Sequence, residues 1–415
     1  MVAVLVFVCQ GVRAQPASPT RSAAVTIDQA VQEAIDHNLN LLAERFNLQV
    51  ADAARLTASL RPNPVVTASV TRPDQPLVDA GISPYEQVFR TDVVIERGAK
   101  RERRIDQADL AKSVSEMQLL DATRTLVLGV EGAFVGVQVG KLNVALARDN
   151  LAAFNSVVAI NTERVRTGDL SQMELARSRL AALQFQNDVR QQETTLSAAR
   201  TRLATLLGRD AAAGEPDAIG DLRHDTDVPG YEALKGRALA SRPDLLAARI
   251  DQARSTADTR LQIANGIVDY TVSGEYHRQE GTSARGNAYA VFFSAPLPLF
   301  NRNQGEIARA QAEDRQLQTK VEALELEIGS EVATAYTQYT AARAIVDTIE
   351  QQMLTQAHDV RAATEYAYRR GEASFVELLD AVRAFNDTSQ SYNDARADYA
   401  RSLYTLDSIS GRVNP

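Results

Sequence analysis

The apolar positions in the carboxyl-terminal half follow the period of an α-helix over a long stretch. Between residues 317 and 353 they form one stripe with a mean spacing of 3.6 residues: Leu317, Val321, Leu324, Ile328, Val332, Ala335, Tyr339, Ala342, Val346, Ile349 and Met353. A left-handed coiled coil needs a period of about 3.5, so this pattern predicts a nearly straight helix with little supercoil.

Two long tracts lack proline, one between residues 84 and 216 and one between residues 298 and 415. Because an interior proline costs a helix about 3 kcal/mol, both tracts are predicted to be helical. Each folds back at an Arg-x-Gly turn that ends at Gly168 or Gly371. The stretch from Gly98 to Gly168 alone would form a rod on the order of 100 Å long.

The two tracts belong to a duplicated unit. The turn glycines Gly168 and Gly371 lie 203 residues apart, and so do Gly208 and Gly411, at which the helical runs stop. A glutamate follows each turn glycine after six residues. Self-similarity at a fixed offset indicates that a structural unit of about 200 residues is present twice.

Four short segments between the helical tracts read as strands. Residues 89–96 and 268–277 alternate polar and apolar side chains with a period of two, and residues 65–71 and 288–296 supply a partner for each. Lengths near ten residues match the strands of membrane barrels, which have about 9–11 residues. Such barrels start at about eight strands, since unpaired edge amides in lipid cost several kcal/mol each. Four strands are therefore expected to join those of other copies.

Most of the charged side chains on the polar faces of these strands are carboxylates. Asp92 and Glu96 lie in the first repeat and Asp269 and Glu275 in the second. Arg90 adds one positive charge among them. If these side chains line the lumen of a barrel, the acidic surface favours the passage of cations.

The chain is expected to divide into a signal peptide and two repeats. Residues 1–14 have the apolar centre and Val-Arg-Ala end of a secretory signal whose basic start is missing. The first repeat covers 25–208, a linker rich in Asp, Gly and Ala covers 209–230, and the second repeat covers 231–411, each repeat holding a helix, two strands and a long helical hairpin. Cys9, the one cysteine, is either removed with the signal or a lipid acceptor.

Composition narrows the function further. The net charge is −8, and the densest basic spot, residues 101–104, reads as a solvated helix start near a membrane edge rather than as a nucleic-acid footprint. Apart from the leader, no stretch of about 18 uncharged apolar residues is present, so membrane contact is expected from strands. The four histidines have no ligand spacing, which predicts no metal site.

Several motifs in this order resemble the TolC family of outer-membrane efflux channels over residues 25–411. They are Arg61 to Pro64, the turns Gly168 to Leu175 and Tyr368 to Asp380, and Pro296 to Gly305, which looks most like the CzcC-like heavy-metal branch. The resemblance implies a mainly α fold with a small β part. It further implies a homotrimer with a 12-stranded β-barrel in outer-membrane lipid, continued by a periplasmic α-helical barrel. The implied partners are a periplasmic adaptor protein and an inner-membrane resistance-nodulation-division pump.

The resemblance also assigns candidate gate residues at the periplasmic tip. Glu377 and Asp380 match two acidic positions that ring the lumen, and they lie three apart on one helical face. Three copies would bring six carboxylates to the axis, whereas the alternative is a solvated helix face. Tyr368 matches a tyrosine that latches the closed tip, and Glu174 matches an acidic residue on the first hairpin.

The chain departs from the family pattern at one latch position. Some members place an arginine two residues after the turn glycine, where this chain has Ala373. Arg369 and Arg370 are the substitutes expected from the sequence.

Three classes of function remain to be compared. The favoured one is a passive export conduit, not an enzyme, for nickel, cobalt, zinc, cadmium or copper ions or for organic compounds. The alternative is a periplasmic coiled-coil scaffold or adaptor, which leaves the duplicated strand pairs unexplained. An enzyme is disfavoured because no nucleophile-base pair, phosphate loop or ligand cluster is evident.

Overall fold

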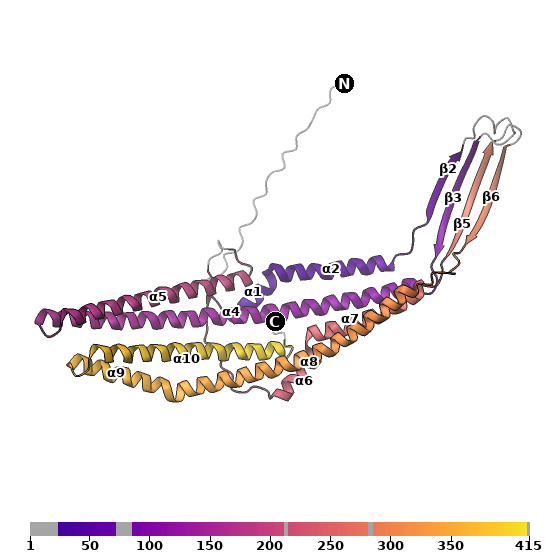
Figure 1. The fold of residues 1–415 in the computed structure, drawn as a ribbon. Coiled ribbons are helices and arrows are strands. Elements are labelled where there is room, and N and C mark those ends of the chain that lie inside the picture. The colour runs from indigo at the N-terminus through magenta and orange to yellow at the C-terminus, as the bar shows by residue number, and fades with distance from the viewer. Residues whose placement is uncertain (1–23, 72–84, 211–214, 281–284, 413–415) are drawn as a thin grey trace, which may run out of the picture.

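The computed structural model describes residues 24–71, 85–210, 215–280 and 285–412. The expected signal peptide and Cys9 lie outside this part of the chain. Figure 1 shows long helices running side by side and a four-stranded sheet that extends from one end of them at an angle.

The order of elements is the same in both halves. The first half contains β1 (Ala24–Val25), α1 (Ile27–His37), α2 (Leu39–Ser59), β2 (Val65–Thr71), β3 (Tyr85–Ile95), α4 (Lys100–Thr167) and α5 (Gln172–Leu206). The second contains β4 (Asp217–Ala218), α6 (Tyr231–Ser241), α7 (Pro243–Asn265), β5 (Tyr270–Glu280), β6 (Arg285–Ser294), α8 (Gln304–Thr348), a π-helical turn η2 (Ile349–Met353), α9 (Leu354–Arg370) and α10 (Phe375–Ile409). This order confirms the expected fold class of two tandem repeats, mainly α with a small β part.

Local sequence explains where the helices begin and fold back. Ser171 and Ser374 accept a hydrogen bond from the third residue of α5 and α10, which satisfies one of the free amides at each start. The turns before them place Gly168 at φ +88° and Gly371 at φ +79°, a region that side chains with a Cβ rarely adopt. The Arg-x-Gly signal therefore marks two helical hairpins, as predicted.

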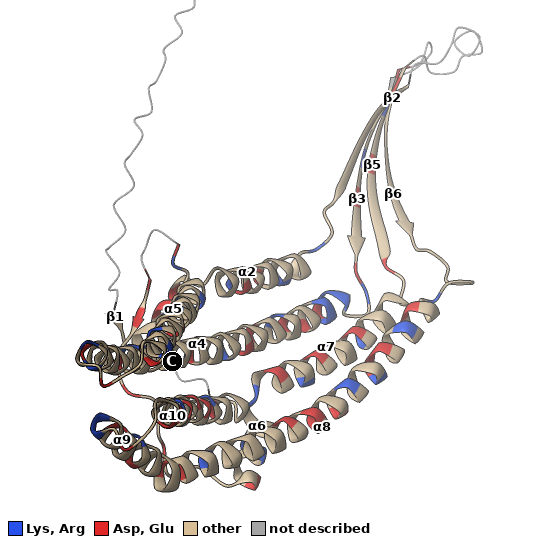
Figure 2. Ribbon diagram, turned by 60° about the vertical axis from the view of Figure 1, so that its left-hand side comes forward, with Lys and Arg blue, Asp and Glu red and all other residues tan. Residues whose placement is uncertain are grey.

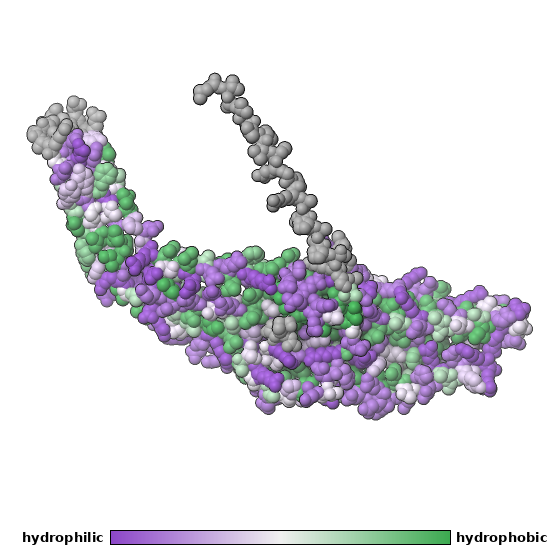
Figure 3. Space-filling view, turned by 180° about the vertical axis from the view of Figure 1, so that it is seen from behind, coloured by the Kyte–Doolittle hydropathy of each residue, from purple (hydrophilic) through white to green (hydrophobic). Residues whose placement is uncertain are grey.

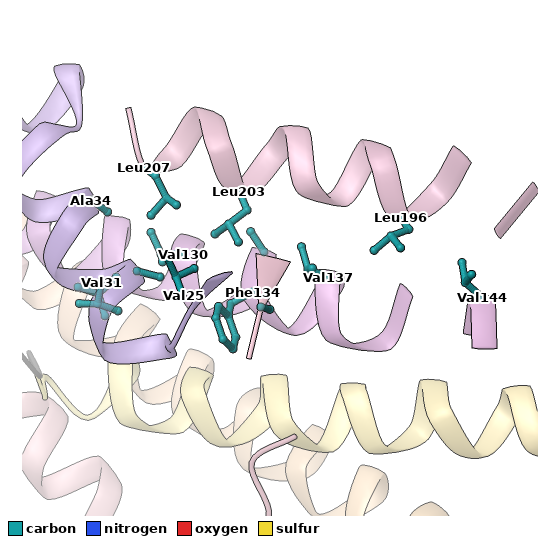
Figure 4. Packing of buried hydrophobic residues seen from close by; sticks show 14 residues of the cluster. Val25, Val31, Ala34, Val130, Phe134, Val137, Val144, Leu196, Leu203 and Leu207 are labelled. Carbon is teal, nitrogen blue, oxygen red and sulfur yellow. The ribbon is translucent and has the colours of Figure 1, made fainter. Parts of the chain in front are cut away.

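The 68-residue helix α4 is the central element of the first repeat. Its Val130, Phe134 and Val137 pack against Leu203 of α5 and against Ala34 of α1, which Figure 4 shows from close by. By length and composition α4 is apolar enough to cross a membrane, but half of its most apolar window is buried inside the protein. Its apolar residues are thus used as a core between helices.

The expected stripe of the second repeat forms the equivalent core. Val321, Ile328, Val332 and Val346 are buried on α8 among α6 and α10. The expectation of a nearly straight rod fails beyond Ile349, because a π-helical turn adds a residue to the register there. Met353, the last member of the expected stripe, is consequently exposed, and Figure 1 shows a bend between α8 and α9.

The four longer strands form one antiparallel sheet in the order β2-β3-β5-β6. The central pair joins the two repeats, with Arg90 opposite Glu275 and Asp92 opposite Ser273. Because side chains alternate across a strand, these four residues share one face, and Phe89 and Tyr276 stack on the other. Figure 3 shows hydrophobic side chains gathered on this strand region.

The segment between the repeats folds back onto both of them. Its β4 pairs in parallel with β1. Further along, Arg223 donates hydrogen bonds to Asp407 of α10 at 2.7 Å and to Asp225 at 2.8 Å. Glu131 of α4 is buried near Arg223 and Asp407, and burial raises its pKa to about 8 although Arg223 opposes the shift. The expected linker is thus clamped between α4 and α10.

Candidate functional site

The two hairpin tips lie together at the end of the helices away from the sheet (Figure 1). An apolar cluster joins them and contains Phe154, Val157, Ala181, Phe185, Tyr368, Phe375, Leu378 and Val382. It draws residues from all four tip helices, α4, α5, α9 and α10. The tips of the two repeats are therefore packed against each other within one chain.

Tyr368 connects the hairpins through a buried hydrogen bond. Its side chain is 4% exposed, and its hydroxyl donates to Oδ1 of Asn161 on α4 at 2.7 Å. Arg164, one turn further along α4, donates to the Tyr368 carbonyl oxygen at 3.4 Å. Burial raises the pKa of Tyr368, although the contact with Asn161 opposes the shift. The tyrosine thus stays neutral and can act as a donor.

The sequence missed Asn161 and Arg164 as partners of Tyr368. Arg369 pairs with Glu365 at 2.6 Å, and the Arg370 guanidinium lies over the Tyr366 ring, so the latch role suggested for these two arginines stays a prediction. A signal was available, because Asn161 continues the buried stripe of Phe154 and Val157 at helical spacing. A polar residue on such a stripe indicates a specific buried partner.

The acidic candidates at the tip lie on the first turn of α5 and on the first two turns of α10. Glu377 is exposed and completes a capping box, in which the Ser374 amide donates to its carboxylate at 2.6 Å. This backbone bond, and then the bond to the Ser374 hydroxyl, lower the pKa of Glu377. Asp380 is exposed one turn later, and Glu174 is partly exposed at the equivalent position of α5.

The four acidic candidates near the sheet fall into two groups. Asp92 and Glu275 lie on its polar face, where Arg90 donates to Asp92 at 2.8 Å and stands 3.7 Å from Glu275. The remaining two, Glu96 and Asp269, lie one residue outside their strands. They adjoin the helix-side ends of β3 and β5, and the lumen position that the sequence predicted for them stays a prediction.

Glu96 and Asp269 form ion pairs at the junction of sheet and helices. Arg104 donates to Glu96 at 3.0 Å and lowers the pKa of that carboxyl. Lys100 is 2.8 Å from Asp269, which also accepts the Arg97 amide at 2.9 Å. These contacts fasten the start of α4 to the strands.

The polar face of the sheet still holds more acidic than basic groups. It carries Glu86, Asp92 and Glu275 against Arg90, and His277 lies between two of the carboxylates, 3.1 Å from Glu86. No group of three or more His, Cys, Asp or Glu side chains that could hold a metal ion is found among the described residues.

Comparisons with known proteins agree with this arrangement. A family model described as "Outer membrane efflux protein" matches residues 234–412. The cobalt-zinc-cadmium resistance protein CzcC of Cupriavidus metallidurans is 25% identical over 400 residues, which cover 96% of this chain and 93% of CzcC. The nickel and cobalt resistance protein CnrC of the same organism is 24% identical over 71% of this chain and 70% of its own.

A solved structure shares the fold. That of the outer membrane protein VceC from Vibrio cholerae has a TM-score of 0.76 at 18% identity, covering 93% of this chain and 96% of VceC. The family model is described by outer-membrane efflux, and VceC is an outer membrane protein, so the matches favour the export channel over the periplasmic scaffold. The chain is therefore CzcC-like over nearly its whole length, matches the outer membrane efflux protein model over residues 234–412, and has the fold of TolC-like outer-membrane channels.

Proposed function

We propose that three copies of this chain export heavy-metal cations through a shared passive tunnel. Each copy lends its four strands to a twelve-stranded barrel in the outer membrane, and the helices continue the tunnel across the periplasm. An inner-membrane resistance-nodulation-division pump supplies the energy, and a periplasmic adaptor protein links the two. The channel itself carries no cofactor and performs no covalent chemistry.

The open sheet is the observation that carries this proposal. In the described part of the chain its outer strands, β2 and β6, each pair on one side only. Val66, Val70, Val291 and Phe293 on these strands are 63–81% exposed, although they are apolar. A lipid environment accommodates such side chains, but unpaired edge amides there cost several kcal/mol each. Pairing β2 of one copy with β6 of the next removes these edges, and the family resemblance favours three copies.

The choice of cargo rests on the relatives and on charge. CzcC and CnrC are named for resistance to cobalt, zinc, cadmium and nickel. In this chain, Glu86, Asp92 and Glu275 outnumber Arg90 on the polar face of the sheet. Three copies would multiply that surplus around one lumen, which lowers the energy of a cation inside it.

The tip provides the gate in this proposal. Glu377 and Asp380 from three copies form a ring of carboxylates at the constriction, and Glu174 lies on the neighbouring hairpin. Tyr368 holds the hairpins together through its bond to Asn161. Separation of the hairpins would widen the constriction.

Complementation tests the transport function. A strain that lacks its own efflux channel would express this chain together with an adaptor and a resistance-nodulation-division pump from the same source, and growth would be measured with zinc, cadmium, cobalt and nickel salts. We expect metal tolerance to return only when all three components are present. Restored tolerance to organic compounds, with none to metals, would contradict the assigned cargo.

Conductance tests the carboxylate ring. Glu377→Gln with Asp380→Asn removes both charges, while glutamine can still serve in the capping box. The ratio of cation to anion permeability across a planar bilayer should fall in this variant. Asp359→Asn, at an exposed site on α9, is the matched control and should leave the ratio unchanged. An unchanged ratio in the double variant would reject the ring.

A further inference from the structure

The loop between β6 and α8 presents apolar side chains to the outside of the protein. Leu297 is 79% exposed, Leu299 67% and Phe300 90%, and they lie within four consecutive residues. They belong to the segment Pro296 to Gly305, which carries the resemblance to the CzcC-like branch. They have no role in the proposed barrel or gate. Exposed apolar residues clustered in this way indicate a binding surface.

Hydrogen bonds fix the loop in this conformation. The Leu299 amide donates to the Leu297 carbonyl at 2.9 Å, and the Gln304 side chain donates to the Phe300 carbonyl at 3.1 Å. Asn303, at the start of α8, donates to the Gln262 carbonyl of α7 at 2.7 Å. The chain therefore holds the three apolar side chains outward instead of letting them fold against the helices.

The loop continues the apolar face of the sheet. Tyr289, Val291 and Phe293 are exposed along β6, and the loop begins directly after that strand at its helix-side end. In Figure 2 the trace between β6 and α8 projects sideways beyond both elements. This is the level at which a bilayer crossed by the strands would end.

Basic side chains surround the same level. Figure 2 shows Lys and Arg gathered at the sheet-side end of α4, while basic and acidic residues alternate along the sheet-side part of α8. Arg101 donates to the Ser59 carbonyl at 2.6 Å and Arg302 to the Pro298 carbonyl at 3.2 Å, and neither guanidinium has an ion-pair partner among the described residues. Arginine at the rim of a membrane protein pairs with lipid phosphate, while apolar and aromatic side chains enter the interface beside it.

We propose that loop 295–303 is a lipid anchor that inserts Leu297, Leu299 and Phe300 into the phospholipid leaflet on the periplasmic side of the outer membrane. The loop then sets the depth and tilt of the barrel against the helical tunnel. This inference rests on the proposed function, because it requires the strands to cross the membrane. A second copy of the chain is the competing occupant of the surface.

The chain has no tryptophan, so single tryptophans report on chosen positions without background. Three full-length variants would be reconstituted into vesicles of phosphatidylethanolamine and phosphatidylglycerol, with and without bromine on the lipid chains. Phe300→Trp probes the loop, and Val291→Trp probes the strand face. Leu326→Trp, at a 78% exposed site on α8, is the matched control away from lipid.

The inference predicts that bromine quenches Phe300→Trp and Val291→Trp and leaves Leu326→Trp unchanged. Bromine near the headgroup should quench Phe300→Trp more than bromine near the bilayer centre does. Quenching of Val291→Trp alone would overturn the lipid anchor and leave the proposed channel standing, and a blue-shifted, unquenched Phe300→Trp would assign the loop to a second copy. Absence of quenching at both positions would overturn the anchor together with the membrane sheet.

Discussion

Replacing Tyr368 by phenylalanine removes one hydroxyl from the contact between the hairpins. That hydroxyl donates to Oδ1 of Asn161, whose side chain is fully buried, and Nδ2 of the same amide has no hydrogen-bond partner in the described part of the chain. Tyr368→Phe thus leaves the side-chain amide of Asn161 without a hydrogen bond while the hairpins are together.

The size of the effect follows from this burial. A buried polar group that loses its partner costs about 1–3 kcal/mol, and the cost disappears when the hairpins separate and water reaches Asn161. The ratio of separated to joined tips should therefore rise by about 5–150-fold, which is the equilibrium factor for such an energy. The aromatic ring remains, so the packing with Phe375 is retained.

Single-channel recording in planar bilayers measures this ratio as the open probability. Tyr366→Phe is the matched control, since Tyr366 lies on the same helix with 57% exposure. Asn161→Ala should raise the open probability too, and combining it with Tyr368→Phe should add little, because both changes break one bond. If the open probability of Tyr368→Phe equals that of Tyr366→Phe, the bond does not hold the gate closed.

Two further predictions concern stability. The pKa of Glu131 is about 8 in the folded protein against 4.5 for the free side chain, so the folded state binds a proton that the unfolded chain releases. Stability should fall as pH rises from 4.5 to 8, by at most about 1.4 kcal/mol per pH unit, and Glu131→Gln should flatten that slope in melting curves recorded across the range. Gly371→Ala should destabilise the tip by roughly 1 kcal/mol or more, because φ is +79° and the new Cβ would stand 3.3 Å from Arg164. Gly168→Ala has similar backbone strain but open space around it, so hydrogen exchange at the Tyr368 amide should increase more in Gly371→Ala.

Much of the fold could be predicted because its signals are local. The proline-free tract and the Arg-x-Gly turn predicted the ends of α4 and its hairpin to within a few residues. The predicted strand 65–71 coincides with β2. Alternation located β5, whereas the start of β6 was missed by three residues because Arg285 to Asn287 show no clear polar and apolar alternation. The π-helical turn at Ile349 could not be predicted, because the apolar spacing before it is that of a regular α-helix.

The site was harder to predict because its partners come from distant parts of the sequence. Tyr368 and Asn161 are 207 residues apart, and the pairing of β1 with β4 likewise depends on tertiary packing. Glu96 and Asp269 read as strand residues because alternation continues one residue past each strand. Their ion pairs with Arg104 and Lys100 became visible only when the start of α4 was placed beside both strands.

Disulfide trapping between the outer strands tests the central claim, that one chain cannot close its own membrane wall. In a Cys9→Ser background, cysteines would replace Val66 or Val70 of β2 and Val291 or Phe293 of β6. Within one sheet β2 and β6 are three strand spacings apart, about 14 Å, whereas a disulfide needs Cα atoms about 5.5 Å apart. The account predicts that oxidation yields crosslinked dimers and trimers and no larger species. A crosslink confined to a single chain, or one that ends at two copies, would contradict it.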